Sequence, residues 1–202
     1  MGTISVDLFI TLDGVYQGPG GPDEDESNGF EFGGWQGHYL DDENGAVIGE
    51  GIDRMDALLL GRRTYDIFAG FWPHRGDEPI AVKFNAMPKF VVSRTLADPE
   101  WAGTTALADV SEVAAIKDRF EDIHVVGSGD LARSLLEAGL VDRLNLYLYP
   151  VALGSGKRLF GGDFGVPKAF RLAQPPRAFP TGAMLLVYEP DGAAVTGFDM
   201  SK

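Results

Sequence analysis

Three short apolar runs, separated along the chain by segments of helical spacing, constrain the fold of this chain most. They are Ala57–Gly61 (ALLLG), Lys89–Ser93 (KFVVS) and Ile123–Gly127 (IHVVG). Such runs are typical of strands buried on both faces of a parallel sheet, where helices cover both faces. Their alternation with helices predicts an α/β fold with a mostly parallel central sheet.

Flanking segments extend this pattern. Residues 4–12 and 143–149 alternate apolar and polar side chains, and residues 184–188 form a further apolar run. The late pair of strands predicts an antiparallel edge beside the parallel strands. We therefore expect a three-layer α/β fold in one domain over residues 1–190, with helices over about residues 47–55, 62–69 and 113–120 and after Gly129, and a loose tail over residues 191–202.

A segment rich in glycine, proline and acids, residues 17–37, interrupts the pattern. It reads GPGGPDEDESNG and then FEFGGWQG. Loops of this length in compact domains are usually functional lids or disordered insertions, and the aromatic side chains here favour a lid. Trp35 and Tyr39 can stack on a flat heterocyclic substrate or can anchor the loop to the core, and the sequence leaves both interpretations open.

Charge and composition exclude several classes of partner and site. The net charge of -13 repels nucleic acid and anionic membranes. Cysteine is absent, and the three histidines, His38, His74 and His124, form no metal-binding pattern, so we expect no metal. The sequence shows no basic leader and no apolar run of ~20 residues, and we expect a cytoplasmic protein.

Candidate binding residues follow the three apolar runs. Ligands of open α/β sheets bind beyond the carboxyl ends of the strands, where the N-termini of helices point. Glycine permits close approach of the backbone, and hydroxyl and guanidinium groups bind phosphate oxygens. Taken singly, the junction at Gly61 can instead be a tight turn with solvated arginines, and Asp130 after Gly129 can be a simple helix cap. Ala132 stands where the dinucleotide fingerprint has its third glycine, which disfavours a Rossmann dehydrogenase.

Several motifs, in this order, resemble the dihydrofolate-reductase-like superfamily. They are ITLDGV, LLLGRRTYDIF, VVSRTL and IHVVGSGDLARSLLEAGLVDRLNLYLYPVALGSGKRLF. Within that superfamily the chain is similar to the C-terminal reductase domain of the riboflavin-biosynthesis deaminase/reductases, as a stand-alone bacterial-type member. The resemblance extends from about Thr3 to Tyr188.

This resemblance implies an NADPH-dependent oxidoreductase. The implied reaction transfers a hydride to a pyrimidine- or pterin-like heterocycle, as in 5-amino-6-(5-phosphoribosylamino)uracil reductase. Relatives often form homodimers, and we expect one here. The implied cofactor-binding residues are Asp13, Gly14, Gly61, Arg62, Arg63, Thr64, Ser93, Arg94, Gly127, Ser128, Gly129 and Leu131.

The resemblance assigns these residues to parts of NADPH. The segment from Gly61 to Thr64 implies contacts with the 2'-phosphate and the pyrophosphate, and Ser93 with Arg94 implies contacts with the adenosine phosphate from the other side. The resemblance also implies that residues 127–131 lie under the pyrophosphate and ribose of NADPH. Asp13 and Gly14 match the start of the loop that closes over the nicotinamide.

The sequence defines the catalytic acid less clearly than it defines the cofactor-binding residues. Folate reductases hold the substrate ring with an acid on the first helix, and Asp42 is the candidate here, although an acid in a first turn is also a typical dipole partner. The tryptophan- and proline-containing stretch that precedes that acid is replaced by residues 17–37. Two alternatives therefore stay open: a catalytically silent NADPH-binding or sensory protein, and an atypical dihydrofolate reductase.

Overall fold

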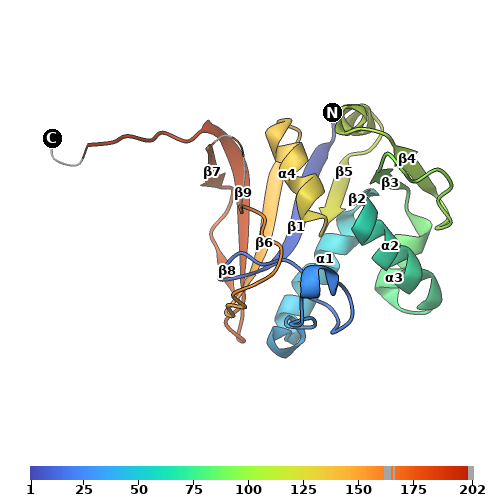
Figure 1. Ribbon diagram of the computed structural model, residues 1–202, viewed down its shortest axis with the longest axis horizontal. Helices are drawn as coiled ribbons and strands as arrows, with labels where there is room; N and C mark the ends of the chain where they lie inside the picture. Colours follow the sequence, from blue (N-terminus) through green and yellow to red (C-terminus); the bar gives the residue numbers. More distant parts are fainter. Residues whose placement is uncertain (162–164, 166, 200–202) are drawn as a thin grey trace.

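The computed structural model describes residues 1–161, 165 and 167–199. Within these residues a nine-stranded sheet forms the centre of the protein, in the order β4-β3-β2-β5-β1-β6-β9-β7, with β8 paired to β9 (Figure 1). The strands are β1 (Thr3–Thr11), β2 (Ala57–Gly61), β3 (Lys89–Val92), β4 (Thr104–Leu107), β5 (Asp122–Val126), β6 (Arg143–Tyr149), β7 (Lys168–Leu172), β8 (Arg177–Ala178) and β9 (Met184–Ala193).

Parallel pairing joins β4, β3, β2, β5, β1 and β6, whereas β9 runs antiparallel to β6, β7 and β8. In the β1–β5 pair, Thr3 lies opposite Asp122 and Asp7 lies opposite Val126. The predicted mostly parallel sheet with an antiparallel edge is confirmed. Because β3, β2, β5 and β1 are parallel neighbours, their carboxyl ends lie at one edge of the sheet.

Helices cover both faces of the sheet. The α-helices are α1 (Asp42–Arg54), α2 (Arg62–Phe71), α3 (Pro79–Ala86) and α4 (Gly129–Glu137), and the 3-10 segments are η1 (Ser27–Gly29), η2 (Gly37–Tyr39), η3 (Trp72–His74) and η4 (Val110–Asp118). None of the helices in the described residues is long and apolar enough to cross a membrane.

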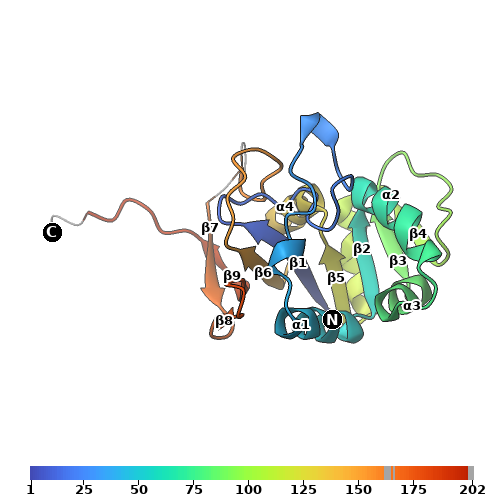
Figure 2. The ribbon, with the colours of Figure 1, turned by 90° about the horizontal axis from the view of Figure 1, so that it is seen from below.

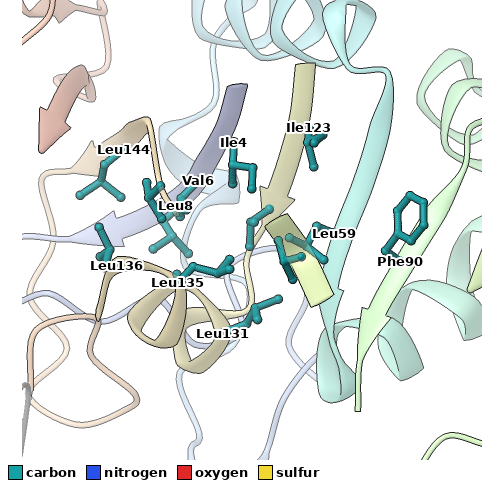
Figure 3. Packing of buried hydrophobic residues seen from close by; sticks show 14 of the residues in the cluster. Ile4, Val6, Leu8, Leu59, Phe90, Ile123, Leu131, Leu135, Leu136 and Leu144 are labelled. Carbon is teal, nitrogen blue, oxygen red and sulfur yellow. The ribbon is translucent and has the colours of Figure 1, made fainter. Parts of the chain in front are cut away.

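Alternation along β1 places successive side chains on opposite faces of the sheet. Ile4, Val6 and Leu8 gather with Leu135 and Leu136 of α4 in one buried cluster (Figure 3). Each fully buried side chain of this kind stabilises the fold by roughly 1.5–3 kcal/mol. The opposite face of β1 and β6 therefore turns toward α1, where Val47 lies in a second cluster.

Several elements differ from the expectation. The helix expected over residues 113–120 is the 3-10 segment η4, which begins at Val110 and ends at Asp118. The sequence pattern did not indicate α3, β4, β7 or β8, because these elements are short and carry no clear apolar periodicity. The last strand continues to Ala193, past the start of the expected tail at residue 191. Residues 194–199 run away from the sheet, and residues 200–202 lie outside the described residues (Figure 1).

The segment 17–37 runs out from the end of β1 and returns to α1 (Figure 2). It is fastened at several points. Gln17 is buried, and its Nε2 donates to the carbonyl oxygens of Asp25 and Ser27, each across 3.0 Å. The Trp35 Nε1 donates to the carbonyl oxygen of Gln17 across 2.8 Å. These bonds fix the base and the middle of the loop to each other.

Candidate functional site

The three strand-to-helix junctions lie side by side at the carboxyl edge of the sheet. The backbone N–H of Gly61, at the end of β2, donates to Oγ of Ser128, at the start of α4, across 2.9 Å. From the same junction, Arg62 Nη1 donates across 3.4 Å to Oγ1 of Thr95, which follows β3. The structure thus brings the candidate residues of β2, β3 and β5 together.

The turn into α4 has an unusual backbone. Gly127 has φ 61° and Ser128 has φ 57°, so both residues are in the left-handed region. A residue other than glycine rarely adopts this region, and such residues gather at functional sites. The turn leaves the first N–H groups of α4 at the edge of the sheet, where the helix dipole favours an anion. Thr64 of α2 lies beside Gly127, within 4 Å of the place where a Cβ on Gly127 would be.

The two arginines at the start of α2 have different partners. Arg62 Nε donates to both carboxylate oxygens of Asp66, across 2.9 and 3.0 Å, and both side chains are exposed. Such an exposed pair contributes little stability, so this guanidinium is available to a ligand. Arg63 Nη1 instead donates to Oδ1 of Asp25 across 3.0 Å. Asp25 belongs to the segment 17–37.

Asp25 also holds a second cation. Lys157 Nζ donates to its other carboxylate oxygen across 2.6 Å, and the Asp25 side chain keeps only 8% of its surface exposed. Burial alone would raise the pKa of Asp25, but hydrogen bonds from Lys157 and Ser27 outweigh burial and lower that pKa. Asp25 is therefore an anion held between Arg63 and Lys157. Sequence reasoning did not single it out, because one acid among several in a loop carries no distinguishing pattern.

A cavity of about 330 Å³ opens beside the start of α4. Its volume is in the range of small-molecule sites. The Tyr16 ring covers Gly129 so closely that a Cβ at that position would collide with the ring. Cations dominate the charged residues of the lining. The cavity is lined by Tyr16, Asp130, Arg133, Gly156, Lys157, Arg158 and Gly161.

Asp13 ties the end of β1 to this cavity wall. Its carboxylate accepts hydrogen bonds from Thr11 Oγ1 at 2.6 Å, from the N–H groups of Leu153 and Gly154 at 3.1 and 2.8 Å, and from Arg158 Nη2 at 3.0 Å. These bonds, led by the Thr11 hydroxyl, outweigh the opposing effect of burial and hold the pKa of Asp13 well below its usual value. Gly14 follows with φ 81°, a conformation that favours glycine. The structure thus gives Asp13 and Gly14 a role in shaping the turn.

The other residues that the sequence predicts to bind the cofactor, Ser93, Arg94 and Leu131, lie near the same carboxyl edge of the sheet. Ser93 Oγ accepts from the N–H groups of Thr95 and Leu96 at 3.3 and 3.2 Å, which orders the turn after β3. Arg94 is exposed in that turn. Leu131 is buried in the core, where its Cβ lies close to Gly61.

The aromatic residues of the segment 17–37 pack on a buried tyrosine. Trp35 is only 8% exposed and meets Tyr149 edge-on, with ring centroids 5.6 Å apart. Tyr39 is half-buried, with its ring centroid 6.3 Å from that of Tyr149. This placement favours an anchoring role for Trp35 over stacking on a ligand.

The first turn of α1 places Asp42 and Asn44 differently. Asp41 is the N-cap and accepts from the Asn44 N–H across 2.8 Å, while Asp42 is exposed in the position of a dipole partner. Asn44 is fully buried. Its Nδ2 lies 3.5 Å from the Tyr149 hydroxyl, and its Oδ1 has no partner among the described residues. The polar group that α1 turns into the protein is therefore Asn44.

Comparison with known proteins gives the chain a family. The model of the RibD C-terminal domain matches residues 2–174. The uncharacterized protein YyaP of Bacillus subtilis (strain 168) is 27% identical over 199 residues, which cover 94% of this chain and 95% of that protein.

Two solved structures have the same fold. One is a provisionally named riboflavin biosynthesis protein of Shewanella sp. PV-4, with a TM-score of 0.65 at 20% identity over 94% of this chain and 99% of that one. The other is a pyrimidine reductase-like protein of Corynebacterium diphtheriae, with a TM-score of 0.60 at 14% identity over 94% and 92% of the two chains. At these identities the likeness shows the fold alone, and the family follows from the match over residues 2–174. The chain belongs to the RibD C-terminal domain family.

Proposed function

We propose that this protein is an NADPH-dependent reductase that transfers a hydride to a pyrimidine- or pterin-like heterocycle. One observation carries the proposal: the Gly61–Ser128 and Arg62–Thr95 hydrogen bonds join three strand-to-helix junctions into one edge. In open α/β sheets this edge is where nucleotides bind. The name of the Corynebacterium diphtheriae relative, a pyrimidine reductase-like protein, supports the substrate class.

The residues at this edge fit a dinucleotide with phosphate groups. Gly127 adds no side chain above the start of α4, and Ser128 directs its hydroxyl back to Gly61, so an anion can approach the turn at Gly127, whereas the Tyr16 ring covers Gly129. Arg62 and Arg94 are exposed on either side and can bind phosphate oxygens. The local positive charge offsets the repulsion expected from a chain with net charge -13.

Each group has a role in this proposal. Arg62, with Thr64, binds the 2'-phosphate of NADPH, and the start of α4 binds the pyrophosphate. The cavity beside Tyr16 takes the nicotinamide end and the adjoining heterocycle. The bound cofactor supplies the hydride, and the protein orients the substrate and excludes water.

Arg63 supports a second candidate function, an NADPH-binding sensor without turnover. Its guanidinium and the ammonium of Lys157 are both neutralised by Asp25. A ligand phosphate that uses these cations must displace Asp25, and displacement would move the segment 17–37. Such a coupled movement is what a sensory protein needs.

NADPH oxidation separates the two functions. Purified protein is incubated with NADPH and a panel of aminopyrimidines, dihydropterins and quinone-like acceptors, and the absorbance of the reduced nicotinamide is followed. A reductase consumes NADPH with at least one acceptor and leaves it unchanged without acceptor. Tight NADPH binding with no consumption by any acceptor supports the sensor, and absence of NADPH binding contradicts both.

A further inference from the structure

The cations that line the cavity beside the start of α4 are all paired with carboxylates of the same chain. These pairs are Lys157–Asp25, Arg158–Asp13 and Arg133–Asp130. The Lys157 Nζ lies 2.6 Å from Asp25 Oδ2, and the Arg158 Nη2 lies 3.0 Å from Asp13 Oδ2. Among the residues that the structure describes, no cation of the lining lacks such a partner. The positive charges of the cavity wall are therefore balanced before any ligand binds.

Hydrogen bonds hold Asp25 against Lys157. Asp25 Oδ1 accepts from the N–H of Ser27 across 3.1 Å, from the Ser27 hydroxyl across 2.6 Å and from Arg63 Nη1 across 3.0 Å. The buried side chain of Gln17 connects the two backbones, because its Nε2 donates to the carbonyl oxygen of Asp25 and its Oε1 accepts from the N–H of Lys157 across 3.1 Å. Displacing Asp25 from Lys157 would break several of these bonds, so a ligand phosphate competes with a fixed carboxylate rather than with water.

The two guanidinium groups of the lining are held in a similar way. Arg158 Nε donates to the carbonyl oxygen of Asp13 across 2.8 Å, in addition to the ion pair with the Asp13 carboxylate. Arg133 Nη1 donates to the carbonyl oxygen of Gly161 across 3.3 Å, while its Nη2 pairs with Asp130. Asp130 itself lines the cavity, so a phosphate there would also meet a negative charge. Both arginines thus already donate to protein acceptors, and the cavity wall contains a carboxylate as well.

Tyr16 gives the lining an uncharged hydrogen-bonding group. Burial and the charge of Asp130 raise the pKa of its hydroxyl, against the effect of Arg133, so the hydroxyl stays protonated at neutral pH. Such a hydroxyl can donate to a carbonyl oxygen or a ring nitrogen, and it can also accept a hydrogen bond. A neutral polar ring loses less hydration free energy on entering a partly buried site than a charged phosphate group does. The lining therefore suits an uncharged heterocycle better than a charged one.

We propose that the cavity selects an uncharged heterocycle, and that Asp25 is the specificity-determining residue that excludes substrates with a phosphate group. This inference rests on the proposed reductase function and narrows its substrate class. The compound named for the reductase that the sequence resembles, 5-amino-6-(5-phosphoribosylamino)uracil, carries a phosphate, and the inferred substrate lacks one. Removal of the Asp25 charge should convert the cavity into a phosphate site, because Lys157 then keeps its own charge without a carboxylate partner.

The first test measures the charge of the cavity and needs no turnover. Inorganic phosphate is titrated into 15N-labelled protein, and the amide signals of Gly156, Lys157 and Arg158 report binding in the cavity rather than elsewhere. We expect these signals to show no saturation in wild type up to about 20 mM phosphate, and to saturate with a Kd of about 2 mM or less in Asp25→Asn. Asp23→Asn, at an exposed position of the same segment, should behave as wild type. Equal phosphate affinity in wild type and Asp25→Asn, or no binding by either, overturns the role of Asp25.

The second test compares two compounds that differ only in a phosphate group. They are 5-amino-6-(5-phosphoribosylamino)uracil and the same compound without its phosphate. Both are offered at saturating NADPH, so that a change in cofactor affinity does not contribute. Each is measured as an acceptor, and also as a competitor of the acceptor that wild type reduces fastest.

The ratio between these two compounds is the decisive value. We expect wild type to favour the compound without phosphate by at least about tenfold, in kcat/KM or in the inhibition constant. In Asp25→Asn this ratio should shift at least about fivefold toward the phosphorylated compound, since one competing carboxylate is removed. Asp23→Asn should keep the wild-type ratio. A wild type that favours the phosphorylated compound, or a ratio unchanged in Asp25→Asn, overturns the inference.

The failures of the two proposals are distinguishable. Wild type that reduces an acceptor but binds phosphate in the cavity leaves the reductase standing and overturns the exclusion of phosphate. Wild type that reduces no acceptor contradicts the reductase, and the phosphate titration alone then decides the charge of the cavity. If Asp25→Asn does not fold, Asp130→Asn, at an exposed position of α4, frees Arg133 in the same cavity. Its signals should saturate at phosphate concentrations below the wild-type range, and signals that stay as in wild type overturn the inference.

Discussion

The backbone N–H of Gly61 donates to the hydroxyl of Ser128 across 2.9 Å, and this contact joins the end of β2 to the start of α4. Ser128 takes a left-handed conformation at the N-cap of α4, and its side chain binds Gly61 while its backbone begins the helix. Two junctions that are far apart in the sequence thereby become one surface.

Ser128→Ala should loosen this surface. The variant leaves the Gly61 N–H without its acceptor, and we expect the free energy of unfolding to fall by about 1–2 kcal/mol. NADPH binding should weaken, because the start of α4 is no longer fixed against β2. Urea unfolding and a fluorescence titration with NADPH measure the two effects. Ser134→Ala, which alters an exposed serine of the same helix, is the control and should change neither value.

Asp25→Asn should strengthen the binding of NADPH. The substitution releases Arg63 and Lys157 from a buried carboxylate, and both cations then become available to phosphate. We expect the Kd to fall by about two- to tenfold, as for the loss of one competing ion pair. Asp23→Asn changes the net charge equally at an exposed position of the same segment. Equal tightening in both variants would show a general charge effect and contradict the role of Asp25.

Asp13→Asn should destabilise the protein in a manner that depends on pH. Its pKa is lowered in the folded protein, so the stabilisation from its ionised form is present above the unfolded value, roughly 3.9, and is lost as the pH falls. At neutral pH the variant should lose about 1–2 kcal/mol of unfolding free energy, since a charged acceptor of several hydrogen bonds is replaced. The difference between variant and wild type should shrink below about pH 4. A difference that stays constant down to acid pH contradicts this account.

Much of the fold could be predicted because local patterns determine it. The apolar runs of β2, β3 and β5 and the alternation of β1 and β6 reflect burial that each strand experiences over its own length. α3 escaped prediction because it is short and buries little more than Ala81 and Phe84. β4 is an edge strand of polar composition (TTAL), which reads like a loop.

The candidate site could be predicted only in part, because local sequence patterns reveal some of its residues but not the contacts between distant segments. Glycine, serine and arginine at strand ends carry a local signature, and Gly61, Arg62 and Ser128 could be found from it. Asp25 and Lys157 lie 132 residues apart, and their contact depends on how the segment 17–37 folds back onto the protein. No local pattern distinguishes Asp25 from the other acids of that segment.

The most direct test of the account compares the affinities for NADPH and NADH in wild type and Arg62→Ala. NADH lacks the 2'-phosphate, so Arg62, which is exposed and donates to Thr95, should matter mainly for NADPH. We predict that Arg62→Ala weakens NADPH roughly ten- to hundredfold and NADH much less, because a charge-assisted hydrogen bond contributes about 1.5–3 kcal/mol. Arg75→Ala, at an exposed arginine paired with Glu78, should leave both affinities unchanged. Equal losses for the two cofactors, or no loss for either, would contradict the placement of the 2'-phosphate at this edge of the sheet.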